Sequence, residues 1–162
     1  MDDLWPENLA ANRIKSPVTI LKEQASLLGQ KTQNAVQAQV RSIEADYQGY
    51  WETLTEKEMK LRYEFCILAP GLGNYRYKLF TISHNVDLYP VIFNLDEGVA
   101  GEMEDDRFEK RGTEVLAKSE KEFSDMLKEI LRSERTKEII QVLFSQSTDM
   151  HGDLESLERS EA

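Results

Sequence analysis

His84 and Asp87 form the most plausible acid–base pair in the chain, since a histidine and a carboxylate lie three positions apart. Imidazole titrates near neutral pH and can act as a general acid or base. A histidine at the end of a strand, however, is more often a hydrogen-bonded turn residue. Catalysis by His84 and Asp87 is therefore the alternative hypothesis rather than the leading one.

Cys66 is the only cysteine, and it lies in an apolar run. It cannot form an internal disulfide, and in such a run a cysteine usually behaves as a small buried hydrophobe. Neither Cys66 nor any serine lies in a recognisable nucleophile motif. With only two histidines in the chain, a structural zinc site would need carboxylate ligands. We expect no metal and no other cofactor.

The segment LAPGLGNYRYKLF, residues 68–80, combines two glycines with cationic and phenolic side chains. Phosphate-binding glycine loops of the common kinds lead from a strand into a helix, whereas this segment leads into residues typical of a strand. Residues 70–74 therefore predict a five-residue hairpin loop in which Ala69 faces Tyr75. Leu72 at its tip either packs on a neighbouring element or contacts a partner.

Basic and aromatic side chains interleave on this hairpin, as they do on sheets that stack bases and hold phosphates. The constellation consists of Arg62, Arg76, Lys78 and Tyr75. The five-residue loop puts the cations on one face and Tyr63 and Tyr77 on the other, and it pairs Phe65 with Leu79. The alternative function is an RNA-directed or small-molecule enzyme that uses this hairpin and His84. The favoured interpretation of the constellation is structural: its long amphipathic side chains lie at a partly covered face of the sheet.

Residues 96–111 contain seven acids, three bases and two glycines, which predicts a loop. Their spacing lacks the alternating ligands and closing glutamate of a calcium loop. The segment would present four carboxylates to a partner protein with a basic surface, where electrostatic attraction raises the association rate. These candidate binding residues are Glu102, Glu104, Asp105 and Asp106.

The whole chain is acidic, because its 162 residues carry 30 acidic and 20 basic side chains, a formal charge of −10. This charge disfavours non-specific attraction to nucleic acid or to an anionic membrane. The first residues are acidic where a secretory signal carries positive charge, and no apolar stretch approaches bilayer length. We expect a cytoplasmic protein without a membrane partner, and a homo-oligomer is possible.

Hydrophobic periodicity predicts an α+β fold. Ser16 and Pro17 start a helix over residues 17–28, while Ser119 and Glu122 form the capping box of a second helix and Ser133 caps a third. Strands are expected within residues 34–45, 59–67, 75–84 and 88–95. The predicted architecture is an antiparallel β-meander of about four strands, with one N-terminal helix and two C-terminal helices packed on it.

Three regions are expected along the chain. Residues 1–15 form an N-terminal arm, residues 16–146 a single α+β domain, and residues 147–162 a polar, disordered tail. No motif identifies a family. The leading hypothesis is a non-catalytic protein-binding module, such as an accessory, inhibitor or immunity-like protein, because the chain is acidic and lacks a recognisable catalytic constellation.

Overall fold

Six antiparallel strands form one sheet in the spatial order β1-β2-β3-β4-β6-β5. The computed structural model describes residues 1–10, 14–44, 59–103 and 108–161, with the backbone alone for residues 150–161. The strands are β1 (Gln37–Ser42), β2 (Leu61–Ala69), β3 (Tyr75–His84), β4 (Val91–Leu95), β5 (Glu109–Arg111) and β6 (Glu114–Ala117). The predicted α+β fold is confirmed, with six strands where about four were expected.

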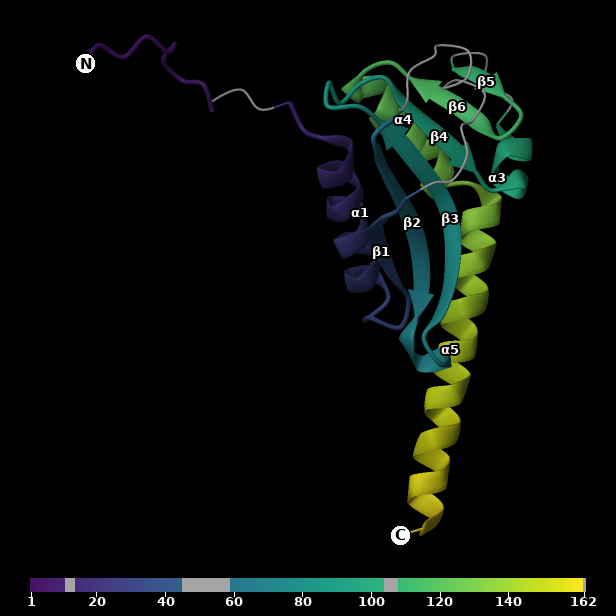
Figure 1. The fold of residues 1–162 in the computed structure, drawn as a ribbon. Helices are drawn as coiled ribbons and strands as arrows, with labels where there is room; N and C mark the ends of the chain where they lie inside the picture. The colour runs from purple at the N-terminus through teal and green to yellow at the C-terminus, as the bar shows by residue number, and fades with distance from the viewer. Residues whose placement is uncertain (11–13, 45–58, 104–107, 162) are drawn as a thin grey trace.

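In the order of the chain, one of the described helices precedes the first four strands and the other described helices follow them. The helices pack on the sheet (Figure 1). They are α1 (Pro17–Lys31), α3 (Glu97–Glu102), α4 (Glu120–Leu131) and α5 (Glu134–Glu161), with the short 3-10 turn η1 (Pro70–Leu72) in the β2–β3 loop. Residues of α1, α4 and α5 border the same side of β2, over Phe65 and Ile67. These three helices therefore share one face of the sheet, which we call the helix face.

The β2–β3 hairpin has the predicted five-residue loop, because Ala69 pairs with Tyr75 and Ile67 with Tyr77. Gly73 supplies the left-handed backbone that the loop needs, with φ 67°. The predicted register holds from Ala69 back to Cys66 and is wrong from Phe65 towards the start of β2. A bulge between Phe65 and Cys66 shifts the pairing, so Phe65 pairs with Phe80 instead of Leu79. Strict alternation would have turned Phe80 towards the polar face, so the bulge brings an aromatic ring into the core.

Residues 96–111 are not the continuous loop that their charge predicts. Asp96 caps the short helix α3 by accepting hydrogen bonds from the backbone N–H groups of Gly98 and Val99, at 3.0 and 3.4 Å. Strand β5 follows, and β6 inserts between β4 and β5 in the sheet. Local carboxylate capping and strand pairing thus override the composition of the segment.

The helix starts are those that the sequence predicts. The side-chain oxygens of Ser16, Ser119 and Ser133 accept hydrogen bonds from N–H groups in the first turns of α1, α4 and α5. Helix α1 continues past Gly29, where a Cβ atom would lie 2.9 Å from the Asn34 side chain. That glycine permits close packing and does not end the helix. Helix α5 continues to Glu161, where the sequence analysis places a disordered tail from residue 147.

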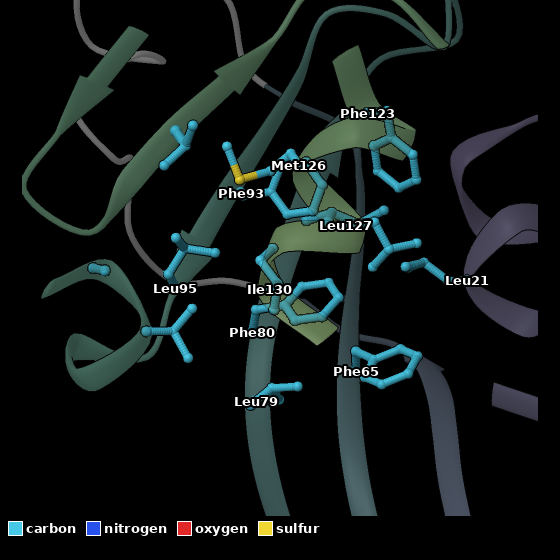
Figure 2. Packing of buried hydrophobic residues seen from close by; sticks show 14 of the residues in the cluster. Leu21, Phe65, Leu79, Phe80, Phe93, Leu95, Phe123, Met126, Leu127 and Ile130 are labelled. Carbon is cyan, nitrogen blue, oxygen red and sulfur yellow. The ribbon is translucent and has the colours of Figure 1, made fainter. Parts of the chain in front are cut away.

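Four phenylalanines form the centre of the core between sheet and helices (Figure 2). Phe65 and Phe80 stack at 5.1 Å between ring centroids, and Phe93 lies 5.6 Å from Phe80 and 5.0 Å from Phe123 of α4. Ring pairs at these separations are stabilising beyond the apolar area they bury. The sheet is therefore joined to α4 by a continuous aromatic column.

Residues 1–10 of the N-terminal arm lie away from the sheet and helices (Figure 1). The large apolar side chains of residues 1–10 are exposed, among them Trp5 at 75%. Among the helices that the structure describes, none combines the length and the apolar character required to cross a membrane.

Candidate binding groove

His84 and Asp87 do not form an acid–base pair in the structure. The His84 ring is 2% exposed and stacks on Tyr63, and its Nδ1 lies 2.7 Å from the backbone oxygen of Asn85. Nδ1 therefore carries the proton and donates it to that carbonyl. Asp87 is exposed in the β3–β4 turn. The geometry is that of a buried histidine at the end of β3 whose Nδ1 is taken up by a backbone carbonyl.

The basic residues of the hairpin lie together on the sheet face opposite the helices. Strand pairing places Arg62, Arg76 and Lys78 on this face, while Tyr75 opposes Ala69 on the helix face. Glu64, which is buried among the cations, forms ion pairs with Arg41 and with Arg76. One carboxylate is thus shared by two arginines, which weakens the positive field available to a phosphate backbone.

Cys66 lies beside Glu64 on the same face, with its Sγ 3.5 Å from a carboxylate oxygen. The thiol is 1% exposed. Burial, together with the neighbouring Glu64 charge, raises the pKa of Cys66 to about 11. Cys66 is therefore held as a neutral thiol and is unsuited to act as a nucleophile.

Glu102, although exposed, caps a helix. Its two carboxylate oxygens accept hydrogen bonds from the backbone N–H groups of Glu134 and Arg135, at 2.8 and 2.9 Å. These donors begin α5, where a negative charge is favoured by the helix dipole. The other three acidic candidates, Glu104, Asp105 and Asp106, lie outside the described residues.

Leu72 is half-buried and packs against the hydrophobic core, with η1 in contact with α5. Of the two interpretations of this hairpin tip, the structure matches packing on a neighbouring element. The contact fixes the end of the β2–β3 hairpin to α5.

Tyr77, Asp96 and Arg135 form a polar cluster that the sequence analysis did not identify. The Tyr77 hydroxyl donates to an Asp96 oxygen at 2.5 Å, and Arg135 lies 3.7 Å from the other Asp96 oxygen. Burial and the Asp96 hydrogen bond raise the pKa of Tyr77. Because the three residues belong to β3, the start of α3 and α5, the cluster joins elements that are distant in the sequence.

A groove of about 470 Å³ opens between α1 and the α4–α5 pair on the helix face. Phe65 and Ile67 of β2 form its floor. Its walls carry Ile20, Leu27 and Leu28 from α1 and Leu127, Leu131 and Ile140 from α4 and α5. Leu27 is 41% exposed, so this wall presents apolar surface to solvent.

The charged residues that line the groove are all basic: Lys31, Lys128 and Arg132. No ion pair joins them to an acid in the part of the chain that the structure describes. Lys128 and Arg132 also border a polar hollow on their other side, together with Glu102, Asp125 and Glu129. In a chain of charge −10, the groove is a local concentration of apolar and cationic side chains.

The groove was not predicted from the sequence, which indicated the start and span of the first helix but not how much of its apolar surface the core covers. Along α1, Ile20 and Leu27 are apolar residues seven positions apart, and Lys31 follows one turn later. Leu27 is 41% exposed although it lies in line with the buried Ile20, so this row of the helix has more apolar surface than the core covers. That excess was the available signal.

The fold and the groove define a class: an antiparallel α+β domain with a solvent-open apolar groove between helices. A scan of the chain against protein-family models and searches of curated proteins and of solved structures find no match. Among the described residues, no group of three or more His, Cys, Asp or Glu side chains is placed to hold a metal ion.

Proposed function

We propose that this protein is a non-catalytic protein-binding module and that the groove between α1 and α4–α5 is its binding surface. The observation that carries the proposal is an apolar groove with the Phe65 and Ile67 floor and a purely cationic set of charged lining residues. Grooves between helices bind apolar side chains of a partner segment. Cations at the rim favour carboxylates on that segment.

The ligand is therefore an apolar segment of a partner protein that also carries acidic side chains. This differs from the basic partner expected for the acidic segment around Glu104, which is a separate prediction about residues outside the described part of the chain. The two partner types have opposite charge. The charge of the peptides that the protein selects can thus distinguish the two hypotheses.

Peptides selected from a random library on the immobilised full chain provide the test. We expect selected peptides to combine large apolar with acidic residues. Binding, measured by fluorescence anisotropy, should weaken at least about tenfold for Leu27→Glu, because a carboxylate on the groove wall opposes both the apolar contact and the ligand charge.

Val142→Glu is the matched control, because Val142 is 49% exposed on α5, close to the 41% of Leu27, and does not line the groove. Its affinity for the same peptides should stay within about twofold of the unchanged chain. If the selected peptides were basic and bound Leu27→Glu and the unchanged chain equally well, the groove would not be the binding surface. That result would support the acidic segment as the binding surface instead.

A further inference from the structure

The first ten residues of the N-terminal arm form a segment, called the arm below, that has the chemistry that the groove would recognise. It exposes Leu4, Trp5 and Leu9, at 91%, 75% and 65%. Its charged side chains are all acidic: Asp2, Asp3 and Glu7. An apolar, acidic segment and an apolar, cationic groove thus occur in one chain, each with its apolar surface in water.

The arm is locally shaped around its largest side chain. An Asp3 carboxylate oxygen accepts a hydrogen bond from the Trp5 backbone N–H at 3.0 Å, so a carboxylate is held at the backbone of the tryptophan. The groove of about 470 Å³ falls within the range of about 300–1,000 Å³ that ligand pockets occupy. The apolar Trp5 side chain matches the apolar floor in character, and the acidic side chains near it in the sequence match the cationic rim in charge.

The chain between Trp5 and α1 is long enough for the arm to reach the groove. Nine residues separate Trp5 from Lys15, whose carbonyl accepts a hydrogen bond from Tyr89, and about 3.3–3.6 Å for each extended residue gives a reach of roughly 30 Å. Helix α1, with 15 residues, is about 22 Å long at 1.5 Å per residue. The arm can therefore turn back and extend along the whole wall that α1 contributes.

We infer that the arm binds in the groove of its own chain and competes there with the partner segment; this rests on the proposed function. In Figure 1 residues 1–10 lie away from the sheet and helices, and Leu27 on the groove wall is 41% exposed; on this inference that arrangement is the released state. A short tether gives the arm an effective concentration on the order of millimolar. That exceeds the concentration of a second copy at micromolar protein, so binding within one chain is favoured over exchange between chains.

The test compares the unchanged chain with Leu4→Ser/Trp5→Ser/Leu9→Ser, which keeps the length and charge of the arm and removes its apolar side chains. The probe is a fluorescein-labelled peptide of sequence MDDLWPENLA, measured by anisotropy. Loss of the internal competitor should tighten probe binding about tenfold. Val86→Ser/Val142→Ser removes exposed apolar side chains elsewhere and should leave probe affinity unchanged.

Equal affinity of the probe for the unchanged chain and the triple variant, or no binding to either, would overturn the inference. If library-selected peptides still bind and discriminate Leu27→Glu in that case, the proposed function stands without it. Sedimentation showing a dimer that the triple substitution dissociates would also overturn binding within one chain, since the arm would then occupy a second copy.

Discussion

At the scale of single residues, Glu64 shows how one buried carboxylate can determine the chemistry of its surroundings. It forms ion pairs with Arg41 and Arg76 and lies within 3.5 Å of the Cys66 thiol. Arg41 and Arg76 thus pair with a carboxylate that is itself buried. Burial, together with the Glu64 charge, raises the pKa of the Cys66 thiol.

The raised pKa of Cys66, about 11 against an ordinary 9.0, predicts low reactivity. At pH 8 the thiolate population falls by about 100-fold relative to an ordinary thiol, and burial blocks access as well. Alkylation by iodoacetamide, followed by mass spectrometry, should therefore be at least about 100-fold slower in the folded chain than in denaturant. Equal rates would show that the thiol is accessible and ordinary.

The same pKa predicts how stability depends on alkaline pH. The folded state binds the Cys66 proton more tightly than the unfolded state, so this contribution is complete below about pH 9 and is lost as pH rises towards about 11. Chemical denaturation should show a shallower decline between pH 9 and 11 for Cys66→Ala than for the unchanged chain. Equal declines in the free energy of unfolding for the two proteins would contradict the raised pKa of Cys66.

Glu102 is a cap, and its substitution should act on stability. In Glu102→Gln one carboxylate oxygen becomes an amide group that cannot accept from the start of α5, and the favourable charge is lost. The free energy of unfolding should fall by about 1 kcal/mol. Asp87→Asn, at an exposed turn carboxylate, is the isosteric control and should stay within about 0.5 kcal/mol. Equal effects of the two changes would argue against the cap.

At the scale of elements, the fold follows from patterns that have a direct physical reading. The strict alternation from Met59 to Ile67 predicted β2, and hydroxyl caps predicted the starts of α1, α4 and α5. The bulge beside Phe65 could not be predicted from alternation, because it is selected by burial of Phe80 against other strands. Strands β5 and β6 are three and four residues long, too short for periodicity to reveal.

Core truncations should rank above the loss of a cap. Phe65→Ala and Leu127→Ala each remove a buried side chain from the core between the sheet and α4, at a cost of about 2–5 kcal/mol. Ser119→Ala removes one capping hydrogen bond, at about 1 kcal/mol. Urea denaturation measures the free energy of unfolding of each variant and so ranks the three. A larger loss for Ser119→Ala than for both core variants would contradict the packing in Figure 2.

At the scale of the whole molecule, the candidate site is a property of how helices are spaced over the sheet. Leu27, Leu131 and Ile140 come from three different helices, and only their packing over Phe65 and Ile67 brings them to one groove. Sequence patterns identified apolar helix faces but not how much of each face the core covers. The charge of −10 pointed to a basic partner, whereas the groove concentrates cations.

The central claim, that the groove is the binding surface, is tested most directly by methyl NMR of the full chain during titration with a library-selected peptide. The account predicts chemical-shift changes at the methyl groups of Leu27, Leu131 and Ile140 that saturate together, while Val142 stays unperturbed. Saturating changes at Val142 with none at the three groove residues would place the ligand elsewhere and contradict the account.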